Sequence, residues 1–109
     1  MGGRKKRLPW RNHEEAVVES FRRDPKFAAE YLNAVLEDGD QPELLLALRL
    51  LASAFGGMSA LAGSAELNTT TLYRSLSATG NPELRSLTAL LKAMGMRLAV
   101  QPLERRARA

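Results

Sequence analysis

The sequence predicts a mostly helical protein, folded as a single domain of five or six helices with one short strand near its C-terminal end. Three observations lead to this prediction. Apolar residues recur every three or four positions along most of the chain, which is the spacing of an amphipathic helix. Glycine and proline divide the chain into segments of helical length. The 109 residues are 45% hydrophobic, which is enough for one hydrophobic core.

The first 12 residues, MGGRKKRLPWRN, are rich in glycine and basic side chains, so we predict a flexible basic arm. Leu8 and Trp10 are its large apolar residues. Two roles are open for them, packing onto the first helix or docking on DNA or a partner. A short first helix is expected from about 14 to 22, and the helical domain as a whole from 13 to 101.

Two long helices are expected next. Asp24 and Pro25 form a start signal, because an N-cap residue precedes a proline at the first helical position. This helix should run to about residue 37 and end at Gly39. The following helix, to about residue 55, is apolar on most sides and should therefore be central. Gly56 and Gly57 end it.

Residues 58–77, MSALAGSAELNTTTLYRSLS, predict two short helices joined by a tight turn. The first covers 58–65. The second follows Asn68, whose side-chain oxygen can accept the free N–H groups of the first turn. Leu72 and Leu76 lie four residues apart, so they should share the inward face of the second helix.

The outward face of this second helix carries hydroxyls, a phenol and a guanidinium but no acid, so it does not repel phosphate. A single helix also fits a DNA major groove about 12 Å wide. The residues expected to bind DNA are Asn68, Thr69, Thr70, Thr71, Tyr73, Arg74 and Ser77, with Ser59 at the start of the first helix. Arg74 is the best candidate for a guanine contact or a phosphate clamp. Each of three residues has an alternative role. Arg74 is then part of a solvated helix face, Asn68 serves only as the N-cap, and Tyr73 packs on the scaffold.

The last helix is expected to be capped by Asn81, opened by Pro82 and stopped by Gly95. Its predicted inward residues are Leu84, Leu87, Leu90, Leu91 and Met94. Residues 96–100 then alternate between apolar and other side chains, which predicts one short strand before Pro102. A lone strand leaves its backbone unpaired, so pairing with the same strand of a second copy is our hypothesis.

Several function classes are disfavoured by composition. Cysteine is absent and His13 is the single histidine, so we expect no metal site, no cofactor and no enzymatic activity. No apolar run approaches the roughly 20 residues that span a bilayer. We therefore expect a cytoplasmic protein that does not bind membranes.

The net charge of +4 is unevenly distributed. The N-terminal arm and the basic tail over 102–109 carry much of the positive charge. Residues 12–57 hold four basic and nine acidic side chains, whereas residues 58–104 hold four basic and three acidic ones. This division suggests an acidic surface that suits a basic partner, and a separate neutral or basic surface around 58–77.

The register of residues 58–77 resembles the helix-turn-helix of the Cro/repressor-type (Xre) family, with small Ala62 at the helix crossing and apolar Leu67 after the turn. Glu66 departs from that pattern, since the family usually has glycine there. A left-handed conformation at Glu66 would cost roughly 1 kcal/mol.

The amino-acid sequence also resembles that of the HigA-like addiction module antidote family over about residues 14–101. The segments that carry this resemblance are DPKFAAEYLNAVLEDGD, LLLALRLLASAFGGMSALA and LNTTTLYRSLSATGNPELRSLTALLKAMGMRLAV.

The resemblance implies an antitoxin that neutralises a RelE/ParE-like toxin and represses its own operon by binding double-stranded operator DNA. A homodimer reading an inverted repeat is implied by the two-fold symmetry of such repressors. Two other functions remain open. One is an Xre-type repressor without a toxin partner, and the other is a protein-interaction module that does not bind DNA.

Overall fold

The computed structural model describes residues 9–103, and within this range the chain forms six helices and no strand. The helices are α1 (Pro9–Arg23), α2 (Pro25–Asp38), α3 (Gln41–Ala54), α4 (Met58–Ala65), α5 (Thr69–Ser75) and α6 (Leu84–Ala93). The mostly helical prediction is therefore confirmed.

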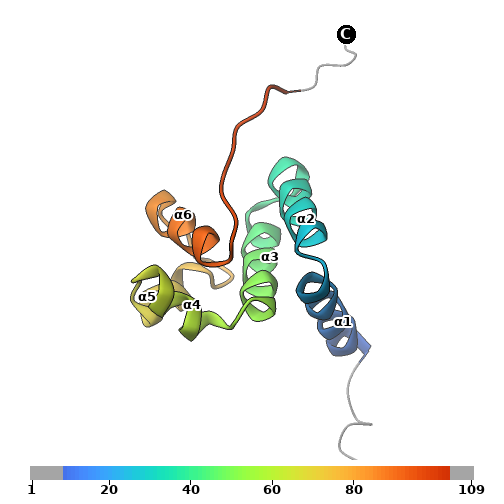
Figure 1. The fold of residues 1–109 in the computed structure, drawn as a ribbon, viewed down its shortest axis with the longest axis horizontal. Helices are drawn as coiled ribbons and strands as arrows, with labels where there is room; N and C mark the ends of the chain where they lie inside the picture. The colour runs from blue at the N-terminus through green and yellow to red at the C-terminus, as the bar shows by residue number, and fades with distance from the viewer. Residues whose placement is uncertain (1–8, 104–109) are drawn as a thin grey trace, which may run out of the picture.

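Helix α3 lies at the centre of the fold (Figure 1). It packs against α1 and α2, which also contact each other, and it packs against α4. Helix α4 in turn contacts both α5 and α6. The molecule therefore has two three-helix units, α1–α3 and α4–α6, connected through α3.

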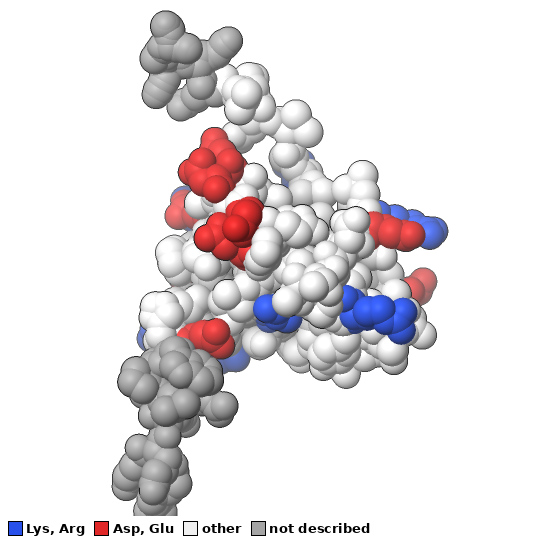
Figure 2. All heavy atoms as spheres, turned by 180° about the vertical axis from the view of Figure 1, so that it is seen from behind, with Lys and Arg blue, Asp and Glu red and all other residues white. Residues whose placement is uncertain are grey.

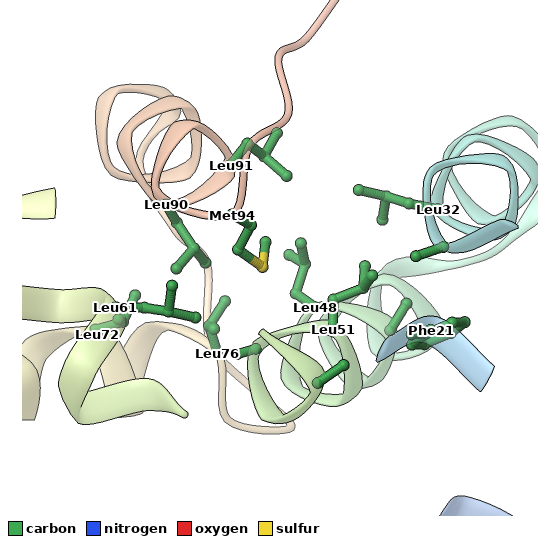
Figure 3. Close-up of a cluster of buried hydrophobic side chains, with 14 of the residues drawn as sticks. Phe21, Leu32, Leu48, Leu51, Leu61, Leu72, Leu76, Leu90, Leu91 and Met94 are labelled. Carbon is green, nitrogen blue, oxygen red and sulfur yellow. The ribbon is translucent and has the colours of Figure 1, made fainter. Parts of the chain in front are cut away.

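One continuous hydrophobic core runs through both units. Leu45, Leu48 and Leu51 of α3 are completely buried. In Figure 3, Leu48 and Leu51 lie between Phe21 and Leu32 on one side and the leucines of α4–α6 on the other. The central position predicted for this helix follows from the apolar side chains on most of its faces.

The starts of α2 and α3 follow their capping residues. The Asp24 carboxylate accepts the Phe27 N–H at 3.1 Å, as the predicted N-cap. Asp40 and Glu43 form a reciprocal capping box, in which each carboxylate accepts the other residue's backbone N–H at 3.0 Å. Local side-chain chemistry thus fixes both starts.

The first helix begins earlier than predicted. Residues 9–12 are helical, so they do not belong to the flexible arm that we expected over 1–12. Proline suits the first helical position, where Pro9 lies, because a backbone N–H at that position has no acceptor within the helix and its loss costs no hydrogen bond. Residues 1–8 of the predicted arm, residues 104–109 of the predicted tail, and the side chains of Leu8 and Trp10 lie outside the described part.

The last helix begins later than predicted. Glu83 is its N-cap residue, and neither Asn81 nor Pro82 has the predicted role. Leu84 is 69% exposed instead of inward, whereas Leu90, Leu91 and Met94 are buried as expected. The Gln41 side-chain amide donates a hydrogen bond to the Gly80 carbonyl at 3.2 Å, in the non-helical loop that precedes α6.

The predicted strand over 96–100 is wrong for the single chain. Gly95, with φ +82°, ends α6 as expected. Residues 96–103, named here the C-terminal segment, then leave the helices without regular structure (Figure 1). A strand needs a neighbour to complete its hydrogen bonds, and the described residues of one chain offer none.

No single helix among residues 9–103 is long and apolar enough to cross a membrane; α3 and α4 meet that test only together, across a 90° bend.

Leu72→Ala should lower the free energy of unfolding by about 2–5 kcal/mol, because it removes a side chain that is only 3% exposed. Urea denaturation followed by circular dichroism measures this change. Leu84→Ala is the control, and its effect should be small because Leu84 is mostly exposed. Equal losses in the two variants would contradict the assignment of Leu72 to the core.

Candidate nucleic-acid interface

The turn between α4 and α5 is fixed by backbone hydrogen bonds. The Leu67 N–H donates to the Ala62 carbonyl at 2.8 Å, and the Glu66 N–H donates to the Gly63 carbonyl at 3.1 Å. These two hydrogen bonds at the end of α4 require a residue in the left-handed backbone conformation. Glu66 adopts it, with φ 58° and ψ 43°. The departure noted in the sequence thus places a non-glycine residue in a conformation that glycine adopts more easily.

Helix α5 begins as predicted. The Asn68 side-chain oxygen accepts the Thr71 N–H at 2.8 Å, which confirms Asn68 as the N-cap. Leu72 and Leu76 are buried, so the predicted inward face is also confirmed. The helix ends at Ser75, and Ser77 follows it in the loop.

The far end of α5 is held by α3. The Arg49 guanidinium donates to the Leu76 carbonyl, a backbone acceptor near the helix end. Gly80 lies directly against the same region, because an added Cβ would come within 2.1 Å of the Ser75 carbonyl oxygen. Together with the Gln41 contact, these interactions hold both α5 and the following loop against α3.

The exposed face of α5 keeps its polar groups accessible. Tyr73 is 53% exposed, and Thr70 and Arg74 are also exposed. Within residues 9–103 the Arg74 side chain forms neither an ion pair nor a hydrogen bond. Its carbonyl accepts the Ser77 hydroxyl at 2.8 Å. A free guanidinium on a fixed helix is available to an anionic or planar hydrogen-bonding partner.

Two shallow hollows flank α5 and share Thr71. One has a volume of about 370 Å³ and places Thr71, Arg74 and Ser77 beside the loop residues Thr79 and Asn81. The structure therefore brings three predicted residues together. It adds Thr79, which we did not predict for the site, and Asn81, which we predicted only as a helix cap.

The second hollow, of about 270 Å³, joins Asn68 and Thr71 to Glu83 and to Ser86 of α6. The remaining predicted residues line neither hollow. These are Ser59 at the start of α4, the half-buried Thr69, and the exposed Thr70 and Tyr73.

Charge is not uniform around α5. The helix itself has no acid, as the sequence indicated, but Glu66 lies in the turn before it and Glu83 lies in the second hollow. Glu83 thus lies beside the leading end of α5 and Glu66 precedes that end in the turn, whereas Arg74 lies further along the helix. On the face drawn in Figure 2, most acidic groups lie on the side of α1 and α2, whereas the largest basic groups lie on the side of α4–α6, with acidic groups beside them.

These features define a small helical domain that presents one short polar helix on a rigid support. A protein-family model described as "Probable addiction module antidote protein" matches residues 16–102. The chain belongs to this family. The antidote part of the resemblance is therefore confirmed, whereas its HigA-like and Xre-type parts stay predictions.

A relative from Haemophilus influenzae, described as an uncharacterized protein, is 35% identical over 71 residues. That match covers 65% of this chain and 72% of the relative. No solved structure matches the chain.

Gly80→Ala should destabilise the protein by about 1–3 kcal/mol, because the new methyl group would overlap the Ser75 carbonyl. Thermal unfolding measures the loss. Gly63→Ala is a matched control, since Gly63 lies in α4 with open space around its Cβ position and alanine favours helix. A Gly80→Ala protein as stable as the Gly63→Ala protein would contradict the close contact.

Proposed function

We propose that this protein is the antitoxin of a type II toxin–antitoxin module, which neutralises a RelE/ParE-like toxin and represses its own operon by binding operator DNA. Membership of the antidote family supports the antitoxin role. The observation that carries the DNA-binding role is the exposed Arg74 guanidinium, which has no ion pair or hydrogen bond among residues 9–103, on an acid-free helix whose far end is bonded to Arg49 of α3.

In this proposal α4 and α5 form a repressor-type helix-turn-helix, and α5 enters the major groove with its N-terminal end foremost. Arg74 contacts guanine O6 and N7 or clamps a phosphate. Thr71 meets a thymine methyl group. Ser59 and the first N–H groups of α4 bind a phosphate.

The two carboxylates near the start of α5 restrict this docking. Glu83, which lines the same hollow as Asn68, would repel a phosphate placed there, and Glu66 adds a second negative charge in the turn before α5. A carboxylate can, however, accept a hydrogen bond from cytosine N4 in the major groove. We infer that the leading end of α5 meets base edges, and that phosphate contacts come from Arg74, Tyr73 and Ser59.

We assign toxin binding to the acidic surface of α1 and α2. The exposed carboxylates on these helices are Glu14, Glu15, Glu19, Glu30, Glu37 and Asp38. Glu19 pairs with Arg22, and the exposed basic side chains Arg22, Arg23 and Lys26 cluster where α1 meets α2, so the acidic character is greatest towards the end of α2. Two apolar side chains of α2 are also exposed, Phe27 at 41% and Leu36 at 44%. A cationic toxin would be attracted by the carboxylates and could bury the apolar groups. The protein would act in the cytoplasm, without a cofactor.

The first experiment is binding of the purified protein to the duplex upstream of its own gene, with a scrambled duplex as control, across a salt series. Tight, sequence-dependent binding with a steep salt slope supports the repressor role. Equal and weak binding to both duplexes would favour the interaction module that does not bind DNA.

Arg74→Ala should weaken operator binding by about 1–3 kcal/mol, because it removes the free guanidinium from α5. Fluorescence anisotropy at fixed salt measures the affinity, and Arg85→Ala, an exposed arginine on α6, is the control. A loss confined to one base position indicates base reading, and an equal loss on all duplexes indicates a phosphate contact. Unchanged affinity would contradict the assigned face.

Charge reversal on α2 should weaken toxin binding without affecting operator binding. The adjacent small reading frame, co-expressed with this chain, should give a complex whose affinity falls with added salt. Glu30→Lys with Glu37→Lys should weaken it further, whereas Glu83→Lys should not. If no complex forms with wild-type protein that still binds its operator, a repressor without a toxin is the better description.

A further inference from the structure

Glu83 occupies the N-cap position of α6, but its side chain does not cap the helix. Its backbone carbonyl accepts the Leu87 N–H at 2.9 Å, whereas its carboxylate forms no cap hydrogen bond. Within residues 9–103 this carboxylate has neither an ion pair nor a hydrogen-bond partner. Serine, threonine, aspartate and asparagine are the usual N-cap residues. The start of α6 therefore gives no structural reason for a glutamate at this position.

The Glu83 carboxylate is held beside the candidate DNA-binding helix. It lines the hollow of about 270 Å³ that also contains Asn68 and Thr71, from the start of α5. Figure 1 shows α5 and α6 on the same side of α3. The loop before Glu83 is attached to α3 by the hydrogen bond from Gln41 to the Gly80 carbonyl. The fold thus presents an acidic side chain next to the end of α5 that is proposed to enter the major groove.

The hollow offers one hydrogen-bond donor group and one acceptor group to a ligand. The Asn68 side-chain oxygen accepts the Thr71 N–H, so its NH₂ group is left to donate. The Glu83 carboxylate can only accept. Neither lysine nor arginine lines this hollow, so no cation there neutralises the carboxylate. A ligand that fits must therefore bring a hydrogen-bond donor to Glu83.

The major groove of DNA supplies such donors from two bases. They are the exocyclic amino groups at N6 of adenine and N4 of cytosine. Guanine and thymine offer the acceptors N7, O6 and O4 on their major-groove edges, and phosphate oxygens are acceptors as well. Each of these acceptors would be repelled by the carboxylate.

We propose that Glu83 is a specificity-determining residue, which accepts a hydrogen bond from the exocyclic amino group of an adenine or a cytosine in the operator. This role rests on the proposed operator binding and extends the reading surface from α5 to the start of α6. The Asn68 NH₂ group donates to an acceptor on a base edge beside that amino group, such as adenine N7. The carboxylate also acts against other registers, because it repels a phosphate that enters the hollow.

The two hollows beside α5 have opposite charge. The hollow of about 370 Å³ contains Arg74 and no acid, whereas the hollow of about 270 Å³ contains Glu83 and no basic residue. An acceptor or anionic group of the DNA therefore fits the first hollow, and an amino group fits the second. This difference gives α5 a preferred orientation over the base edges.

Fluorescence anisotropy with the operator duplex, changed one base at a time, tests the proposal. Unsubstituted purine in place of adenine, or pyrimidin-2-one in place of cytosine, removes the amino group alone and shows which base is read. At one such position the wild-type protein should lose affinity by about tenfold, and Glu83→Ala should lose almost none. Leu84→Ala, at the exposed neighbouring position, should keep the wild-type preference.

Glu83→Ser separates base reading from a structural role. Serine is a favoured N-cap residue, so thermal unfolding should occur at the wild-type temperature or above it. The variant should nevertheless lose the same base preference as Glu83→Ala. Both variants should bind a scrambled duplex more tightly than wild type at low salt, because a group that repels phosphate is gone. This gain should disappear at high salt.

Glu83→Ala and Glu83→Ser proteins that keep every base preference of the wild type would overturn the role of Glu83 and leave operator binding intact. A wild-type protein that binds the operator no better than the scrambled duplex would overturn operator binding, and the role of Glu83 with it. The two failures are therefore distinguished by the wild-type protein alone.

Discussion

The burial of α3 is the constraint on which the rest of the structure depends. Leu45, Leu48 and Leu51 are inaccessible to solvent, and they form the core shared by the two three-helix units. An isolated helix of seven residues such as α5 is not stable in water. The candidate DNA-binding helix therefore owes its position to tertiary packing on α4 and to its attachment to α3.

Arg49 shows how this apolar helix also organises polar groups. It is half-buried on α3, and its guanidinium reaches across to the Leu76 carbonyl, where α5 ends. Carbonyl groups at a helix end lack partners within the helix, and a cation is favourable beside them. Asn68 at the other end caps the first turn. Backbone groups at both ends of α5 thus have side-chain hydrogen-bond partners, while the polar side chains on its outer face remain exposed.

The features that could be predicted best from the sequence are those that depend on neighbouring residues, such as helix caps. Asp24 and Asn68 cap helices through bonds to residues three positions away, so their roles could be read from spacing alone. The Arg49 and Gln41 contacts span 27 and 39 positions, and no local pattern reveals them. The same is true of Glu83, which reaches the candidate site from the loop before α6. Apolar side chains do alternate over 96–98, where Met96 and Leu98 are half-buried and Arg97 is exposed, but a strand requires a partner that the described residues of a single chain do not supply.

Three surfaces with different chemistry result from this arrangement: the polar face of α5, the acidic face of α1 and α2, and the apolar C-terminal segment. The central claim is that the first of these binds operator DNA. Amide chemical-shift mapping with the upstream duplex tests it most directly. We predict that the large changes fall at Ser59 and over 68–77, while the amides of α2 are unaffected. Changes confined to the basic residues at the two chain ends would contradict it.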